Sequence, residues 1–124
     1  MQTKNNLVLC VATLWLLGCA TPVDMRARTP SLDLTSSLSA KTVAICIADR
    51  WENAKIIGMS AGFPINMRQT PDGYTVSASV HNAFETWTGL LADINDNPSG
   101  STTRYFVNGV LGEGSFENAV KECQ

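Results

Sequence analysis

The chain has 124 residues, of which 44% are hydrophobic and 16% charged, with 9 basic and 11 acidic side chains. This length fits one small domain preceded by a targeting segment. The basic residues form no patch, which argues against nucleic acid as a partner. Beyond the first twenty residues, no apolar run is long enough to cross a membrane.

The start of the chain has the layout of a cleaved signal peptide. Lys4 supplies a positive charge, and residues 7–17 form an apolar run that only Thr13 interrupts. A run of this length suits the apolar part of a signal peptide and is too short for a membrane-spanning helix. It leads into the four residues Leu16-Leu17-Gly18-Cys19. An ordinary secretory signal, cut for example after Ala20, is the alternative.

These four residues resemble a lipobox, and the chain therefore resembles a bacterial lipoprotein precursor. The resemblance implies cleavage before Cys19, whose thiol receives diacylglycerol and whose freed amine is acylated. We expect residues 1–18 to be the lipoprotein signal peptide and Cys19 to anchor the protein in a membrane. Ala20, not Asp, follows the cysteine. By the lipoprotein sorting rule, this implies the outer membrane of the cell envelope, facing the periplasm.

Residues 19–37 follow the signal and are rich in Thr, Ser and Pro, with few large apolar side chains. This composition predicts a lipidated flexible tether. Residues 38–124 then form a single α+β domain. Without Lys4 the exported chain carries a net charge of about −3.

A helix is predicted over residues 38–54, with Ser36 and Ser37 as candidate N-caps. Its apolar residues recur at spacings of four and three, as on one face of a helix, and Cys46 lies beside this stripe. A second, short helix is predicted over residues 116–123, capped by Ser115. Its stripe consists of Phe116, Ala119, Val120 and Cys123.

The position of each cysteine in the chain suggests its role. Cys10 is discarded with the signal peptide and Cys19 is lipidated, which leaves Cys46 and Cys123. In an exported and oxidising compartment, a disulfide between this pair is the economical interpretation. Two buried free thiols or a redox site are the alternatives, although the chain contains no Cys-x-x-Cys.

Four extended segments lie between the two predicted helices. Residues 74–80 alternate apolar and polar side chains, which is typical of a half-buried antiparallel strand. A turn at Thr70-Pro71-Asp72-Gly73 joins them to residues 64–69. Residues 87–95 place Leu90, Ala92 and Ile94 on one face, and residues 101–107 are β-prone with their facing left open. Residues 56–59 are a candidate short strand.

The resulting fold class is α+β. We expect a two-layer sandwich in the order helix, four-stranded antiparallel sheet, helix, held by the disulfide. Both helices should cover the apolar face of the sheet. In this layout, and only in layout, the domain resembles small bacterial envelope lipoproteins.

The search for catalytic or metal chemistry yields no site. His81 is the sole histidine, and no recognised nucleophile motif surrounds it. Asp93, Asn95 and Asn97 match the first ligands of a calcium loop, but Pro98 and Arg104 stand where Gly and Glu are required. The glycines from Gly109 to Gly114 do not match a phosphate loop. We therefore expect no catalytic residues, no metal and no cofactor.

The remaining candidate is the polar face of the sheet, where Thr75, Ser77 and Ser79 lie on one strand. This face is either solvated or a binding surface for an envelope protein or a cell-wall glycan. We expect a non-enzymatic, membrane-anchored envelope lipoprotein that acts as a binding or structural module. An accessory subunit of a secretion, assembly or conjugation machine and a small cell-wall-directed enzyme are the alternatives.

Overall fold

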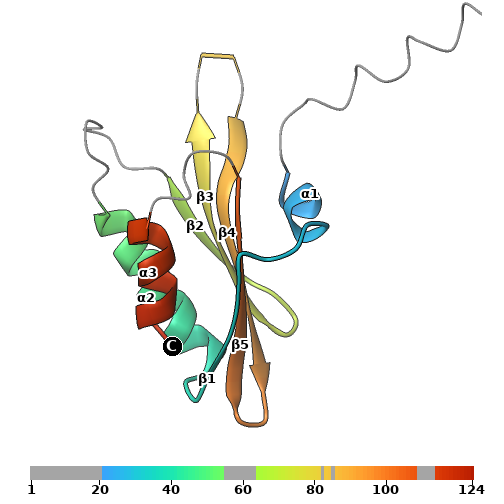
Figure 1. Ribbon diagram of the computed structural model, residues 1–124, viewed down its shortest axis with the longest axis vertical. Coiled ribbons are helices and arrows are strands. Elements are labelled where there is room, and N and C mark those ends of the chain that lie inside the picture. Colours follow the sequence, from blue (N-terminus) through green and yellow to red (C-terminus); the bar gives the residue numbers. More distant parts are fainter. Residues whose placement is uncertain (1–20, 55–63, 82, 85, 109–113) are drawn as a thin grey trace, which may run out of the picture.

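The computed structural model describes residues 21–54, 64–81, 83–84, 86–108 and 114–124. Within them the chain is an α+β protein with a five-stranded antiparallel sheet and a disulfide between Cys46 and Cys123 (Figure 1). The elements in chain order are α1 (Pro22–Arg26), β1 (Leu32–Ser36), α2 (Ala40–Asn53), β2 (Ile65–Gln69), β3 (Gly73–His81), β4 (Thr86–Asn97), β5 (Gly100–Val107) and α3 (Gly114–Glu122).

The strand order across the sheet is β1-β5-β4-β3-β2. Strands β2 to β5 are neighbours in sequence order, and β1 pairs with the outer edge of β5, from Leu32 opposite Tyr105 to Ser36 opposite Ser101. Since β1 and β2 form opposite edges, α2 connects the two edges across one face of the sheet. The predicted number of four strands is therefore wrong by one.

The additional strand comes from the segment predicted as a flexible tether. That prediction is wrong for most of residues 21–37, because they contain α1 and β1. Leu32 and Leu34 pack against the core, while Asp33 and Thr35 on the opposite face are exposed. Leu32 and Leu34 alone are a weak signal for a strand, so the formation of β1 depends on its pairing with β5. Residues 19–20, the candidate strand 56–59 and most of the glycine-rich segment 109–114 lie outside the described residues.

Helices α2 and α3 cover one face of the sheet, as predicted, and enclose the main core (Figure 1). The predicted first helix is confirmed, but it begins later because the hydroxyl of Ser39, not of Ser36 or Ser37, accepts a hydrogen bond from the Thr42 amide. The Trp51 indole donates to the Phe116 carbonyl at 3.2 Å and joins α2 to α3. The fully buried large core side chains include Val43, Ile47, Trp51, Val76, Leu90, Ile94, Tyr105, Phe116 and Val120.

The predicted faces of β3 and β4 are confirmed, and a β-bulge adds one detail. Ala78 pairs with Leu90, but Ser79 pairs with Thr88, so Gly89 is an extra residue in β4. The extra residue reverses the alternation of side chains beyond it. Trp87 therefore packs on the helix-covered side together with Leu90.

The facing of β5, left open by the sequence, follows from its register with β4 and β1. Tyr105 packs in the core under α2 and α3, whereas Phe106 points to the opposite face and packs with Met25 of α1 and Leu91 of β4. Both aromatic residues are buried because both faces of the sheet are covered at this level.

The turn predicted at residues 70–73 is present, with Thr70 and Gly73 exchanging backbone hydrogen bonds. Gly73 is required there, because a Cβ at this position would lie 2.0 Å from the carbonyl oxygen of Ile94. Gly100, at the start of β5, has φ +144°, which favours glycine, and its missing Cβ leaves room for the backbone of Ser36.

Candidate functional site

The face of the sheet opposite α2 and α3 holds the candidate residues Thr75, Ser77 and Ser79. The structure places all three on β3, Thr75 buried and the two serines half-buried. Ser77 lies beside the buried Leu91, and Ser79 pairs with Thr88 at the bulge. Their partial burial means that these hydroxyls are not the most accessible part of the face.

Thr75 is occupied by contacts within the protein. Its hydroxyl donates to Oδ1 of Asp93 at 2.8 Å and accepts from Nη2 of Arg26 at 3.2 Å. Arg26 also holds Asp93 in a two-pronged ion pair, with Nε–Oδ2 at 2.7 Å and Nη2–Oδ1 at 2.9 Å. The Arg26–Thr75–Asp93 cluster thus joins α1 to β3 and β4, and Thr75 serves this junction.

An apolar contact and a helix cap support the same junction. Met25 is fully buried against Leu91 and Phe106. Thr21 and Asp24 form a capping box at the start of α1, in which Thr21 donates to the Asp24 carboxylate and lowers its pKa. Helix α1 is therefore docked on the sheet by a buried side chain and a two-pronged ion pair.

The cluster belongs to a row of side chains in register across all five strands. Arg104 of β5 lies between Asp33 of β1 and Asp93 of β4, and Thr75 of β3 lies between Asp93 and Arg68 of β2. We call Asp33, Arg104, Asp93, Thr75 and Arg68 the charged row. Its alternating charges favour this register, because opposite charges on neighbouring strands attract.

The part of the charged row beyond α1 is open to solvent. The Arg104 and Asp33 side chains are 63% and 55% exposed and lie 3.8 Å apart. An exposed pair at this distance contributes little to stability, about 1 kcal/mol or less. Arg104 and Asp33, together with the exposed Arg68 and Thr35, are therefore among the accessible polar groups of this face. They are the candidate binding surface.

Sequence reasoning missed Met25, Arg26 and the charged row. A signal for α1 was present, since Thr21, Pro22 and Asp24 match an N-cap, a proline at the first helical position and an acidic third residue. The charged row has no linear signature, because its members come from five strands.

The Asp93 carboxyl predicts how stability depends on pH. Burial raises its pKa, but hydrogen bonds from Arg26 and Thr75 and the charges of Arg26 and Arg104 outweigh burial and lower the pKa overall. A carboxyl with a lowered folded-state pKa stabilises the protein above its unfolded pKa of about 3.9, and this contribution is lost as pH falls through the folded value. We expect Asp93→Asn to show a smaller loss of stability between pH 6 and pH 2–3 than the unchanged protein, measured by urea unfolding.

Arg26→Gln serves as the partner variant for this measurement. It removes the main hydrogen-bond donor and charge that favour ionised Asp93, so it should reduce the pH dependence in the same direction. If both variants retain the full pH dependence, the ion pair does not account for it.

His81 lies at the end of β3, exposed, with Nδ1 2.8 Å from the Thr86 hydroxyl on β4. The two residues are paired across the β3–β4 hairpin. The other candidate loop, at the end of β4, forms a local turn in which Asn97 accepts from the Ser99 amide at 2.9 Å. Asp93 of the same stretch is held by Arg26, so this stretch is structural.

Two further polar features lie on the helix-covered side. The Tyr105 hydroxyl is buried without a hydrogen-bond partner among the described residues, and burial together with the Glu117 charge raises its pKa. Arg50 of α2 and Glu122 of α3 form an exposed ion pair close to the disulfide. Both features belong to the packing of the two helices on the sheet.

Over the described part of the chain, no group of three or more His, Cys, Asp or Glu side chains is placed to hold a metal ion. None of the helices described is both long and apolar enough to cross a membrane. No protein-family model matches the chain, and neither a curated protein nor a solved structure matches it.

Proposed function

We propose that the protein is a lipid-anchored binding module of the bacterial cell envelope, held close to its membrane and binding an envelope protein through the exposed part of the charged row. The observation that carries the proposal is the docking of α1. The helix begins at Pro22, three residues after Cys19, and is held to the sheet by Met25 and Arg26. The domain therefore follows the proposed lipid directly.

This arrangement supports a membrane-bound role. From Cys19 to Thr21 the backbone spans at most about 7 Å, so lipidation at Cys19 keeps the domain against the membrane surface. Confinement of this kind raises the effective concentration of the module near a partner in the same membrane. A diffusible small-molecule substrate would gain nothing from it.

The exposed charges support a protein as the partner. Arg104, Asp33 and Arg68 present both signs of charge within one row. Surfaces of mixed charge select partners by complementary charge and suppress wrong pairings. Such a pattern suits a folded protein surface better than a neutral glycan.

The test is photocrosslinking in intact cells. A photoreactive amino acid at Thr35, beside the exposed charges, should yield a discrete protein adduct, whereas the same group at Glu52 on the outer side of α2 should not. The adduct should weaken at least tenfold when Arg104→Glu is added, and also when an ordinary signal peptide replaces the lipobox. His81→Ala should leave it unchanged.

Two outcomes would contradict the proposal. An adduct equally strong from Glu52 would remove the charged row as the binding surface. An adduct that persists without the lipid but disappears with His81→Ala would favour a histidine-dependent activity on a soluble target.

A further inference from the structure

We propose that the tip of the β3–β4 hairpin is a second membrane contact, with Phe84 entering the interface of the leaflet that carries the lipid on Cys19. This inference rests on the proposed function, because it requires the anchor. It adds the orientation of the domain: the hairpin end faces the bilayer and the β4–β5 turn points away from it.

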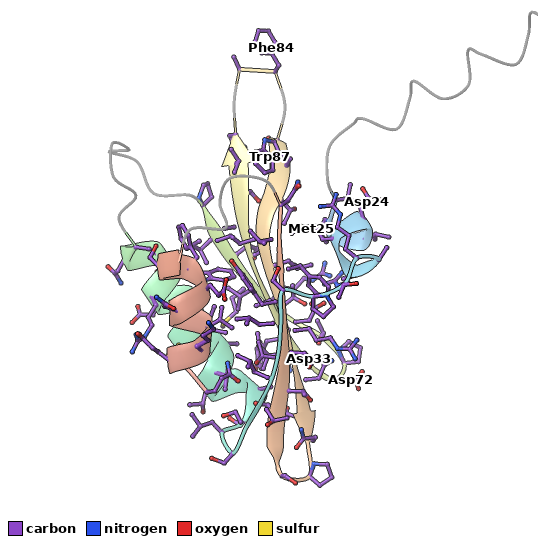
Figure 2. The ribbon with its side chains drawn as sticks, viewed as in Figure 1. Asp24, Met25, Asp33, Asp72, Phe84 and Trp87 are labelled. Carbon is purple, nitrogen blue, oxygen red and sulfur yellow. A yellow bond between two sulfur atoms is a disulfide. The ribbon has the colours of Figure 1, made fainter. Side chains whose placement is uncertain are left out.

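The first observation is the exposure of Phe84. Its side chain is 97% exposed, more than any other large hydrophobic residue among those described. Figure 2 shows it at the far end of the hairpin, beyond Trp87. A phenylalanine in water at the end of a projecting arm gains free energy by entering an apolar phase, and aromatic side chains are favoured at membrane interfaces.

The second observation is the support of the arm. His81 and Thr86 are paired and share a hydrogen bond just below the tip. One step further from the tip, Val80 pairs with Trp87, and both side chains pack against the main core. As far as the pair of His81 and Thr86, the arm is therefore a continuation of the sheet, so a membrane contact at its end would orient the whole domain.

The third observation is the direction of α1. Arg26 contacts Asp93, whereas Met25 contacts Leu91, which is two residues closer to the hairpin along β4. Figure 2 shows Asp24 on the hairpin side of Met25, so the start of α1 lies toward the hairpin end. Because Cys19 is at most about 7 Å of backbone from Thr21, the anchor leaves the domain at the end to which Phe84 projects.

The charge of the tip identifies the kind of membrane contact. The tip residues that the structure describes, Ala83 and Phe84, carry no charge. Attraction to anionic headgroups is therefore excluded as the driving force, and the contact is apolar. It should form on zwitterionic lipid and resist salt.

The experiment uses the full protein as a bacterial host exports and processes it, purified in detergent. With Cys46 and Cys123 bonded and Cys19 in its thioether, an introduced Ala83→Cys is the single reactive thiol and takes an environment-sensitive fluorophore. The protein is reconstituted on vesicles of equal parts phosphatidylcholine and phosphatidylethanolamine, with and without a lipid that carries a nitroxide quencher at its headgroup. Asn97→Cys, at the end of β4 farthest from the tip, is the matched control.

We expect quenching to be several-fold stronger at position 83 than at position 97, in low and in high salt. Phe84→Ser, added to the Ala83→Cys chain, should remove most of this difference. Equal quenching at the two positions, or quenching that does not respond to Phe84→Ser, would overturn the hairpin contact. Flotation of the vesicles separates the two proposals: protein that floats without quenching refutes the hairpin contact alone, whereas protein that does not float refutes the anchor and the proposed function with it.

Discussion

Replacing Cys46 and Cys123 together by Ala should lower the free energy of unfolding by about 2–5 kcal/mol. The two residues are separated by 77 positions, and for a loop of that size the chain-entropy model predicts about 4.5 kcal/mol. The bond also secures the end of α3, which has nine residues and is too short to be stable by itself. Urea unfolding followed by circular dichroism measures the loss.

Arg50→Ala is the matched control for the disulfide variant. It breaks another link between α2 and the end of α3, the ion pair with Glu122, whose side chains are 48% and 58% exposed. An exposed pair is worth about 1 kcal/mol or less, so this control should unfold nearly as the unchanged protein does. A disulfide variant no less stable than Arg50→Ala would contradict the assigned role of the bond.

Met25→Ala should release α1 from the sheet. Truncating a fully buried methionine costs about 2–5 kcal/mol, and Leu91 and Phe106 lose their cover at the same time. Even 2 kcal/mol raises the undocked population about 30-fold. Trypsin cleavage after Arg26 and Arg28 under native conditions should accelerate accordingly, because cleavage tracks the population of the opened state.

Val23→Ala in the same helix is the control for this measurement. Val23 is 73% exposed, so its truncation should change stability by about 0.5 kcal/mol or less and the cleavage rate about twofold at most. Equal acceleration by the two variants would mean that α1 is not held by its buried side. Unchanged cleavage in Met25→Ala would mean that the Arg26–Asp93 pair alone is sufficient.

The docking of α1 also connects the two proposals. If α1 were undocked, some ten further residues would separate Cys19 from the first strand, and the domain would be free to turn relative to the membrane. With Met25 and Arg26 in place, the anchor and the hairpin are parts of one framework. Met25→Ala should therefore weaken the difference in quenching between positions 83 and 97 without preventing flotation.

The elements that sequence reasoning predicted correctly have local signals. The spacing of Val43, Ile47 and Trp51 has the period of a helix, and the alternation from Tyr74 to Val80 has the period of a strand, so each identifies its own buried face. The disulfide followed from counting, because two cysteines remained once Cys10 and Cys19 were assigned to the signal and the anchor. These inferences needed no knowledge of which segments meet in space.

The tertiary structure decided what depends on partners distant in sequence. β1 is a strand because β5 offers it an edge, and Thr75 is buried because Arg26 reaches it from α1. Tyr105 and Phe106 are both buried because helices cover opposite faces of the sheet at that level. The charged row exists only when five strands are in register. Periodicity in the sequence shows which face of a helix or strand is apolar, but not what covers that face. Here α1, a short helix after the proposed anchor, covers part of the polar face of the sheet.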